Sequence, residues 1–374
     1  MTRARFTPLL LLALLGGGCD EDLPKATSIE RMRVLGVELE VVGDAPRATP
    51  RPGESVRASF PTVFPDLEAE GDDLSTMLIR CTAPTRYTGG IPICQEFLDA
   101  ALGQGADIAA VLDMQNLDQD RFRCSDLPVP QITLEGVTVA CLQGPPSVEL
   151  PIPDDYARDA ALFLGVVCEE GDPYISPTEP TLFGCEGAGE EAEVIPINGL
   201  IPVQLDDAAE NRNPDLDALA LYVDLPRNIP SDEAPLENYP DWPAFDGEPS
   251  ALPPRDNCAA QARQLDDDPL RFLSAGSHEL RLRLDPGVRE AGEDGDLETL
   301  EITVYTSWGE MERRFTLFNQ ESPLRNDAFD DTVEWTPPDD GDVSQGGRLL
   351  RFFITLRDGR GGFDMRTFVG CYGP

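Results

Sequence analysis

The chain has 374 residues, of which 41% are hydrophobic, and its 69 acidic residues outnumber 29 lysines and arginines, giving a formal charge of −40. The length is sufficient for two domains with hydrophobic cores, and the hydrophobic content is too high for a disordered chain. The charge argues against nucleic acid as a partner, because phosphate binding needs a basic surface. The 35 prolines and 33 glycines indicate many turns and a mainly all-β design.

The N-terminus has the pattern of an export signal. Residues 1–18 begin with two arginines, continue with a short apolar run and end in three glycines before Cys19. The run is shorter than the roughly 20 residues of a membrane span, so we predict a signal peptide over 1–18. A cysteine at this point resembles the lipobox of bacterial lipoproteins, although Leu15 lies one position too far from it. We therefore predict lipidation at Cys19 and a polar tether over 19–28, with an incidental cysteine after a plain secretory signal as the alternative.

Eight cysteines follow Cys19, and an even number in an exported chain predicts disulfides. Six of them precede position 206 and two follow it, and this even split supports a domain boundary near that position. The sequence does not fix the connectivity, and free buried cysteines are the alternative. Pairing of neighbours predicts four bridges: Cys81–Cys94, Cys124–Cys141, Cys168–Cys185 and Cys258–Cys371.

Residues 29–205 predict a first β-sandwich domain. Apolar residues alternate over 31–42, but the phase slips at Leu35–Gly36, which predicts one strand with a bulge. Further strands are predicted at 56–60, 76–81, 132–141 and 160–168. The last of these is an almost continuous apolar run, typical of a central strand that is covered on both faces.

Two segments of this domain predict other structure. Helical spacing over 94–114 predicts a short helical insertion between strands. Residues 169–193 are acidic and contain prolines, which predicts a loop closed by the Cys168–Cys185 bridge.

A polar, acidic segment over 206–217 predicts a hinge, and residues 218–374 predict a second immunoglobulin-like β-sandwich domain. The proline- and acid-rich stretch 226–256 predicts a long irregular insertion. Over 278–284 three leucines alternate with charged residues, typical of a strand with one buried face. Other strands are predicted at 219–225, 300–308, 350–356 and 363–371. Strands at this spacing with glycine and proline turns are typical of two immunoglobulin-like sandwiches in tandem.

Several short motifs occur in a particular order along the chain. They are Arg33-Val34-Leu35-Gly36-Val37 after the lipobox, the turn Pro52-Gly53-Glu54, Asn211-Arg212-Asn213-Pro214 at the midpoint, Trp335-Thr336-Pro337-Pro338, and Arg357-Asp358-Gly359-Arg360-Gly361-Gly362. Together they resemble a group of myxobacterial-type envelope lipoproteins, and the last turn is similar to those of PKD-like and cadherin-like domains. The resemblance implies an outer-membrane location and sandwich domains, but no catalytic residues. We interpret the last turn as structural, because Asp-Gly and Gly-Gly supply the positive φ angles of a hairpin.

The residue types of common catalytic sites are scarce. His278 is the single histidine, and we interpret it as a partly exposed residue at a strand end rather than the base of a hydrolytic triad. No Gly-x-Ser-x-Gly elbow, Cys-x-x-Cys pair or Gly-x-x-x-x-Gly-Lys loop occurs. Paired carboxylates for glycoside hydrolysis do not stand out. We therefore predict that the protein is not an enzyme, with a cryptic extracytoplasmic hydrolase as an alternative.

Calcium is the one metal for which the sequence offers candidates, because clustered carboxylate and amide oxygens are its ligands. The candidates lie at the predicted hinge: Asp206, Asp207, Asn211, Asn213, Asp215 and Asp217. They do not fit the EF-hand pattern, since a leucine stands where that loop has its glycine. A chain this acidic also forms such clusters by chance, so no cofactor is predicted and calcium stays an option.

These observations predict a lipid-anchored protein of the cell envelope that acts by adhesion, scaffolding or surface display. Its partners would be the membrane, through the N-terminal lipid, and an envelope protein or polysaccharide. The alternative is a carbohydrate-binding or substrate-capturing surface module. For that role Tyr239, Trp242 and Phe245 are the candidate contacts, although we favour the interpretation that they attach the proline-rich insertion to the sandwich.

Overall fold

The computed structural model describes residues 26–65, 71–83, 121–127, 129–134, 137–176, 181–189, 192–205, 210–216, 219–224, 257–259, 271–284, 288–290, 298–318, 330–338, 343 and 345–373. The predicted signal peptide 1–18, Cys19, the helical insertion 94–114 and the insertion 226–256 lie outside these residues. Within them the protein is nearly all-β, as predicted.

The N-terminal half, which we define as the described residues up to Leu205, is built from short and long strands. They are β1 (Arg33–Val34), β2 (Glu38–Val41), β3 (Ser55–Ser59), β4 (Thr62–Val63), β5 (Ser75–Thr82), β6 (Phe122–Arg123), β7 (Gln131–Leu134), β8 (Val137–Gln143), β9 (Ser147–Pro151), β10 (Ala160–Cys168), β11 (Asp172–Ile175), β12 (Phe183–Glu186) and β13 (Val194–Pro202). A short 3-10 helix, η1 (Cys124–Asp126), follows β6.

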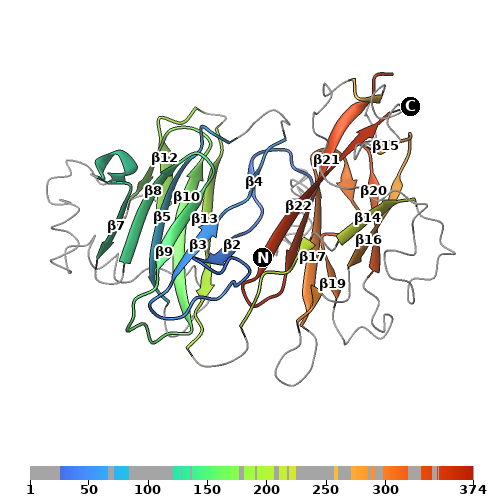
Figure 1. Ribbon diagram of the computed structural model, residues 1–374. Helices are drawn as coiled ribbons and strands as arrows, with labels where there is room; N and C mark the ends of the chain where they lie inside the picture. The colour runs from blue at the N-terminus through green and yellow to red at the C-terminus, as the bar shows by residue number, and fades with distance from the viewer. Residues whose placement is uncertain are drawn as a thin grey trace, which may run out of the picture.

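These strands form three layers (Figure 1). The central sheet has the order β13-β10-β5-β8-β7, and its two faces pack against the sheets β2-β3-β9 and β12-β11-β6. Successive residues of β10 enter opposite cores: Phe163 packs toward β2-β3-β9, whereas Leu162 and Leu164 pack toward β12-β11-β6. This confirms the prediction that β10 is a central strand covered on both faces, and it explains the continuous apolar run.

The predicted bulge at Leu35–Gly36 is instead a complete break between two strands. β1 pairs with β4, whereas β2 pairs with β3 in another sheet. A side chain at Gly36 would overlap the ring of Phe363, which arrives from the C-terminal half. The phase slip in the sequence therefore marks the point where the chain leaves one sheet and passes close to the other half of the molecule.

Two other segments differ from their predictions. The stretch 132–141 is a hairpin of β7 and β8 rather than one strand. The predicted acidic loop 169–193 contains the antiparallel pair β11–β12, which covers one face of the central sheet. In the acidic segment, polar turn residues conceal two strands of four residues each, which are too short to show a clear alternation.

The C-terminal half, which we define as the described residues from Leu219 onward, has two layers. Its strands are β14 (Leu219–Val223), β15 (Arg271–Leu273), β16 (His278–Leu284), β17 (Leu300–Thr306), β18 (Glu310–Met311), β19 (Thr316–Phe318), β20 (Asp330–Thr336), β21 (Arg348–Arg357) and β22 (Phe363–Tyr372). The sheets β14-β16-β20-β18 and β15-β22-β21-β17-β19 enclose one core around the fully buried Trp335. In β16 the leucines at 280, 282 and 284 are buried and the residues between them are partly exposed, as predicted.

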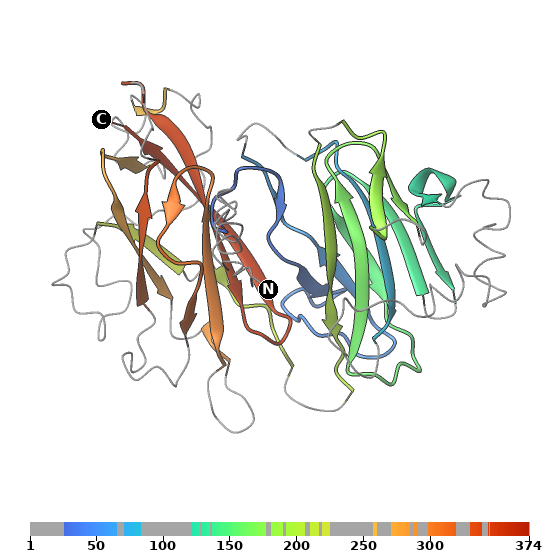
Figure 2. The same ribbon diagram turned by 180° about the vertical axis from the view of Figure 1, so that it is seen from behind.

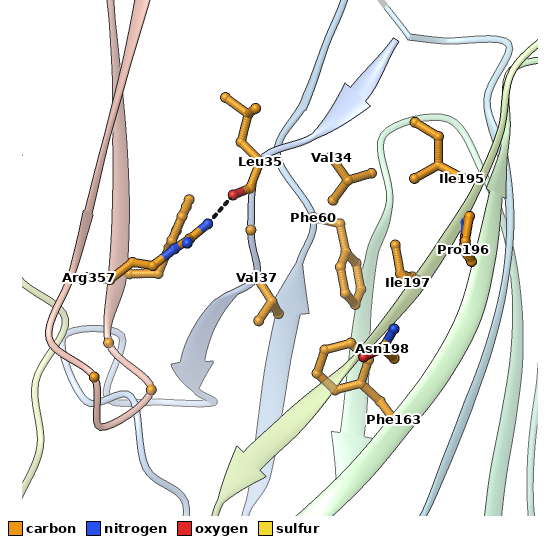
Figure 3. A pocket seen from close by; sticks show the side chains of 15 residues that line it. Val34, Leu35, Val37, Phe60, Phe163, Ile195, Pro196, Ile197, Asn198 and Arg357 are labelled. Carbon is orange, nitrogen blue, oxygen red and sulfur yellow. Dashed lines mark hydrogen bonds between the residues drawn. The ribbon is translucent and has the colours of Figure 1, made fainter. Parts of the chain in front are cut away.

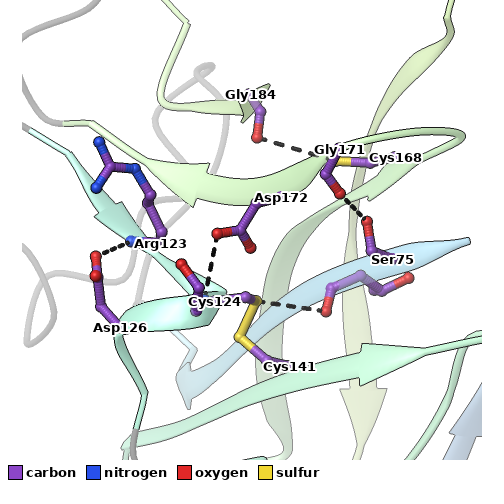
Figure 4. Close-up of a disulfide and its surroundings, with 11 residues drawn as sticks. Ser75, Arg123, Cys124, Asp126, Cys141, Cys168, Gly171, Asp172 and Gly184 are labelled. Atoms are coloured by element: carbon purple, nitrogen blue, oxygen red, sulfur yellow. Dashed lines mark hydrogen bonds between the residues drawn. A yellow bond between two sulfur atoms is a disulfide. The ribbon is translucent and has the colours of Figure 1, made fainter. Parts of the chain in front are cut away.

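Each half contains its own disulfides. The structure contains Cys124–Cys141, Cys168–Cys185 and Cys258–Cys371, which are three of the predicted pairs. Cys81 is also disulfide-bonded, and its predicted partner Cys94 lies outside the described residues. Figure 4 shows the Cys124–Cys141 bridge, with Cys168 and the adjacent β11–β12 pair nearby.

The two halves lie side by side, and the segment that carries β2 and β4 lies between the green sheets and the red β21–β22 hairpin in both views (Figures 1 and 2). The first described residues also bridge the halves. The N–H of Ile29 donates to the carbonyl of Thr306 at 2.8 Å, and the N–H of Thr306 donates to the carbonyl of Thr27 at 2.9 Å. The first described residues of the N-terminal half therefore pair with β17 of the C-terminal half.

Candidate functional site

The junction between the halves brings together three of the motifs that lie far apart in the sequence. They are the break between β1 and β2 (residues 35–37), the midpoint segment 210–216, and the β21–β22 turn (residues 358–362). We call the segment 210–216 the strap. The strap contacts the β21–β22 turn and the nearby β2, and Arg357 beside that turn contacts Leu35.

The strap is attached to the N-terminal half by main-chain hydrogen bonds. The N–H of Ala48 donates to the carbonyl of Asn211 at 2.9 Å, and the N–H of Asn213 donates to the carbonyl of Pro46 at 2.7 Å. A bidentate ion pair between the buried Arg47 and Glu54 holds this region, with distances of 2.9 and 2.7 Å. The hydrogen bonds from Arg47 lower the pKa of the Glu54 carboxyl, and those to Glu54 raise the pKa of Arg47.

Side chains attach the strap to the C-terminal half. The Asn211 amide donates to Asp358 Oδ2 at 2.8 Å, and both residues are buried. The Asn213 amide donates to the carbonyl of Leu39 at 2.7 Å and accepts from the N–H of Phe363 at 3.1 Å. One asparagine thus connects β2 of the N-terminal half directly to the start of β22 in the C-terminal half.

Asp358 also organises the hairpin turn of which it is part. Its Oδ1 accepts hydrogen bonds from the N–H groups of Arg360 and Gly362 at 2.7 and 2.8 Å. Gly359 and Gly361 have positive φ angles of 73° and 109°, as the Asp-Gly and Gly-Gly pairs predict. The turn is structural, as we interpreted it, and its carboxylate simultaneously anchors the junction.

The strap includes part of the predicted hinge and some of the residues that were predicted as calcium ligands. The amides of Asn211 and Asn213 are hydrogen-bonded across the junction, and Asp215 is exposed. The other candidates, Asp206, Asp207 and Asp217, lie outside the described residues. Within the described parts of the chain, no group of three or more histidine, cysteine or acidic residues is placed to hold a metal ion. Over 210–216, hydrogen bonds to both halves hold the segment in place.

A pocket of about 450 Å³ opens at this junction (Figure 3). It enters the core of the N-terminal half between the residues that precede β2 and the edge strand β13. Its walls are mainly apolar, with Phe60 and Phe163 in edge-to-face contact at 5.4 Å between ring centroids, and Asn198 and Arg357 add polar groups to the lining. The other labelled apolar side chains around the pocket are Val34, Leu35, Val37, Ile195, Pro196 and Ile197.

Arg357 is the charged residue among those that line this pocket. Arg357 donates a hydrogen bond to the carbonyl of Leu35, and its guanidinium lies over the ring of Phe363 at 5.6 Å. It also forms an ion pair with Glu301, with its Nη1 3.6 Å from the carboxylate, and both side chains are partly exposed. A ligand carboxylate at the pocket would therefore share Arg357 with Glu301.

Carboxylates from both halves approach one another beside the junction. Burial first of all, and then the nearby carboxylates of Glu40 and Asp364, raise the pKa of Glu38 to about 7. Asp364 at the start of β22 accepts a hydrogen bond from the N–H of Leu216 in the strap at 2.6 Å. The ionisation of Glu38 is therefore coupled to the contact between β2 and β22.

His278 is buried, contrary to the prediction that it is partly exposed. Its Nδ1 lies 2.6 Å from the carboxylate of Asp224, its Nε2 lies 2.6 Å from the carbonyl oxygen of Ser274, and its ring stacks on Trp335. Both ring nitrogens therefore lie within hydrogen-bonding distance of an oxygen atom of the protein, and the ring is held in place at the start of β16.

The sequence reasoning missed the pocket. The apolar residues 194–201 belong to β13, which was not predicted, and Arg357 was assigned only to a turn. Two glycines were the available sign of close packing here. A side chain at Gly36 would overlap the ring of Phe363, and one at Gly199 would overlap the ring of Phe163. The predicted aromatic contacts Tyr239, Trp242 and Phe245 lie outside the described residues.

No protein-family model and no curated protein matches the chain. Among solved structures, it is similar to the native conformation of E. coli alpha-2-macroglobulin, with 9% identity over 90% of this chain and a TM-score of 0.20. It is also similar to the C-terminal domain of the AgI/II polypeptide BspA of Streptococcus agalactiae, with 8% identity over 90% of this chain and 99% of that chain, and a TM-score of 0.19. The chain spans 17% of the length of the macroglobulin. Neither likeness carries an argument about function.

In the part of the chain that the structure describes, no helix is both long enough and apolar enough to cross a membrane.

Proposed function

We propose that the protein is a lipid-anchored component of the cell envelope that displays two immunoglobulin-like sandwich domains in a fixed relative arrangement. Its role is adhesion, scaffolding or surface display rather than catalysis. The signal-like N-terminus with Cys19 supports export and anchoring. The disulfides support an oxidising compartment, and the layered sheets support the sandwich domains. The resemblance to outer-envelope lipoproteins favours the outer membrane.

The strap is the observation that carries the display role. Domains joined by a simple linker move relative to one another by default. Here Asn211, Asn213 and Asp358 connect the halves through buried or half-buried hydrogen bonds, and the first described residues pair with β17. A fixed angle between two sandwiches suits a protein that holds a contact surface at a set distance and direction from its anchor.

The anchor is tested by intact mass measurement of the native protein after membrane extraction, with and without reduction. We expect a species that begins at Cys19, carries added acyl mass, and gains two hydrogens for each predicted bridge on reduction. An unmodified N-terminus would contradict the lipid anchor, and free thiols would contradict the disulfide framework.

The fixed arrangement is tested by small-angle X-ray scattering of the full chain and its Asn211→Ala variant. Loss of this buried, charge-assisted hydrogen bond should weaken the junction by about 2 kcal/mol and broaden the distribution of distances between the halves. The matched control is Asn198→Ala, because Asn198 is exposed on β13 and contributes no contact to the strap. Equal profiles for all three proteins would contradict a strap that sets the domain angle.

The junction pocket favours a second candidate function, a substrate-capturing surface module. Ligand sites in proteins have volumes of about 300–1,000 Å³ and mostly apolar walls, and this pocket has both properties. Its lining of aliphatic side chains and phenylalanine rings, with few polar side chains, suits an apolar ligand better than a sugar. Display and capture differ in one respect that can be measured, since only capture requires the pocket to bind a small molecule.

A further inference from the structure

The composition of the junction pocket restricts what it could bind. Val34, Val37 and Ile195 line it from facing segments, and Phe60 and Phe163 belong to the hydrophobic core that it enters. Arg357 is the one charged residue among the lining residues, and it comes from the other half of the molecule. An apolar interior with one cation matches a molecule that has a hydrocarbon chain and an anionic head.

The volume of the pocket limits how long a hydrocarbon chain it can hold. If one heavy atom takes up roughly as much space as a water molecule in the liquid, about 30 Å³, then 450 Å³ holds about 15 heavy atoms. That number corresponds to a single acyl chain of about ten to twelve carbons with a carboxylate.

The neighbouring strand argues against a peptide as the occupant. β13 is an edge strand, and a peptide that extended the sheet would need main-chain N–H groups along that edge. Pro196 lies in the wall of the pocket and Pro202 ends the strand, and neither has an N–H to donate. Between these prolines the edge is too short for the regular ladder by which strand addition gains its affinity.

We infer that the junction pocket is a binding site for a single-chain anionic amphiphile, a medium-chain fatty acid in chemical class. The acyl chain lies against Phe60 and Phe163, and the carboxylate is bound by Arg357. The guanidinium of Arg357 forms charge-assisted hydrogen bonds with it, in competition with the longer ion pair to Glu301. The inference rests on the capture role of the proposed function and does not depend on lipidation at Cys19.

The test is calorimetric titration of the full chain, extracted from membranes, with decanoate and with uncharged decanol below their micelle-forming concentrations. We expect micromolar binding of decanoate. Val34→Trp should abolish binding of both ligands, because Val34 is half-buried in the pocket wall and the indole would fill the space. The matched control is Val42→Trp, because Val42 is 45% exposed and lies outside the pocket, so its replacement should change neither affinity.

The role of Arg357 is tested by the difference between the two ligands. Arg357→Gln should weaken decanoate binding about tenfold and leave decanol binding unchanged, a pattern that a loss of local structure would not give. Arg314→Gln, at an exposed arginine outside the pocket, is the control and should change neither affinity. No binding of decanoate, or binding that Val34→Trp leaves intact, would overturn the inference.

The protein's own lipid is the other source of an acyl chain at this pocket. Repeating the titration with a Cys19→Ala variant distinguishes the two sources, and mass measurement of the wild-type protein reports lipidation separately. Equal binding by both forms supports a free amphiphile as the occupant. Binding by the variant alone would overturn that assignment, since it would show that the attached lipid already fills the pocket.

Discussion

Strands β10 and β16 show how differently the two halves are built. Every residue of β10 after the first is buried, because sheets cover both faces of the central layer in the N-terminal half. In β16 buried and partly exposed residues alternate, because the C-terminal half has only two layers. The period of the hydrophobic pattern therefore reports the number of layers around a strand, and one chain uses both solutions.

Removal of a disulfide from either half has the largest expected effect on the free energy of unfolding, and it compares the two halves directly. Cys258–Cys371 closes a loop of 113 residues, whereas Cys168–Cys185 closes one of 17. In the chain-entropy model, replacing both cysteines by alanine should cost about 4.7 kcal/mol for the long loop and about 3 kcal/mol for the short one. Unfolding of each variant by denaturant, followed by tryptophan fluorescence and circular dichroism, measures the two costs. A larger loss from the short-loop variant would show that strain or local packing outweighs loop length.

Substitutions on β10 and β16 would test the difference in layers. Leu162→Ala and Phe163→Ala change adjacent residues that enter opposite cores, and each should cost about 2–5 kcal/mol of the free energy of unfolding. On β16, Leu282→Ala should cost a similar amount, whereas Arg283→Ala on the outer face should cost about 1 kcal/mol or less. The same denaturant titration measures all four. A small effect of either β10 variant would contradict the three-layer arrangement.

Many of the strands could be predicted from the sequence because the hydrophobic pattern that identifies each one lies within a short stretch of the chain. The long strands β5, β10, β16, β21 and β22 follow from apolar patterns within ten residues or fewer. The strands that escaped prediction lack this signal. β11 and β12 are short and contain proline or glycine, and β13 carries two prolines and a glycine at the edge of its sheet. Their structure comes from packing on the central sheet rather than from their own sequences.

The candidate site could not be predicted in the same way. Its contacts join residues separated by 147, 174 and 322 positions, in the pairs Asn211–Asp358, Asn213–Leu39 and Arg357–Leu35. Each partner lies in a segment whose glycine, asparagine and aspartate content is explained well enough by a turn. Sequence reasoning therefore found the separate motifs, but no local rule indicated that they meet.

The smallest expected effect concerns the carboxylates that lie between the halves. Because the pKa of Glu38 is about 7 rather than 4.5, the folded protein holds a proton that the unfolded chain releases between these values. The stability this gives is complete below pH 4.5 and is lost as the pH rises through 7. Glu38→Gln should therefore leave stability unchanged at pH 4 and raise it by about 1 kcal/mol at pH 8, after allowance for partial exposure of the carboxyl.

Thermal unfolding of the wild type and Glu38→Gln at both pH values measures this effect. An equal change at pH 4 and pH 8 would show that the substitution acts through packing rather than charge. A loss of stability at pH 8 would show that the Glu38 carboxylate is favourable at the junction, contrary to its burial beside Asp364.

The position of β22 has a consequence for the order of folding. This strand ends one residue before the last described residue, yet it lies between β15 and β21, carries Cys371, and begins at the turn that contacts the strap. The N-terminal half, by contrast, can close its two 17-residue disulfide loops from segments that leave the ribosome early. A chain emerging from its N-terminus can thus complete the central sheet of the first half long before the second. The C-terminal core, its long-range disulfide and the junction pocket all form last, when the final strand inserts, so a truncation of a few C-terminal residues removes all of them at once.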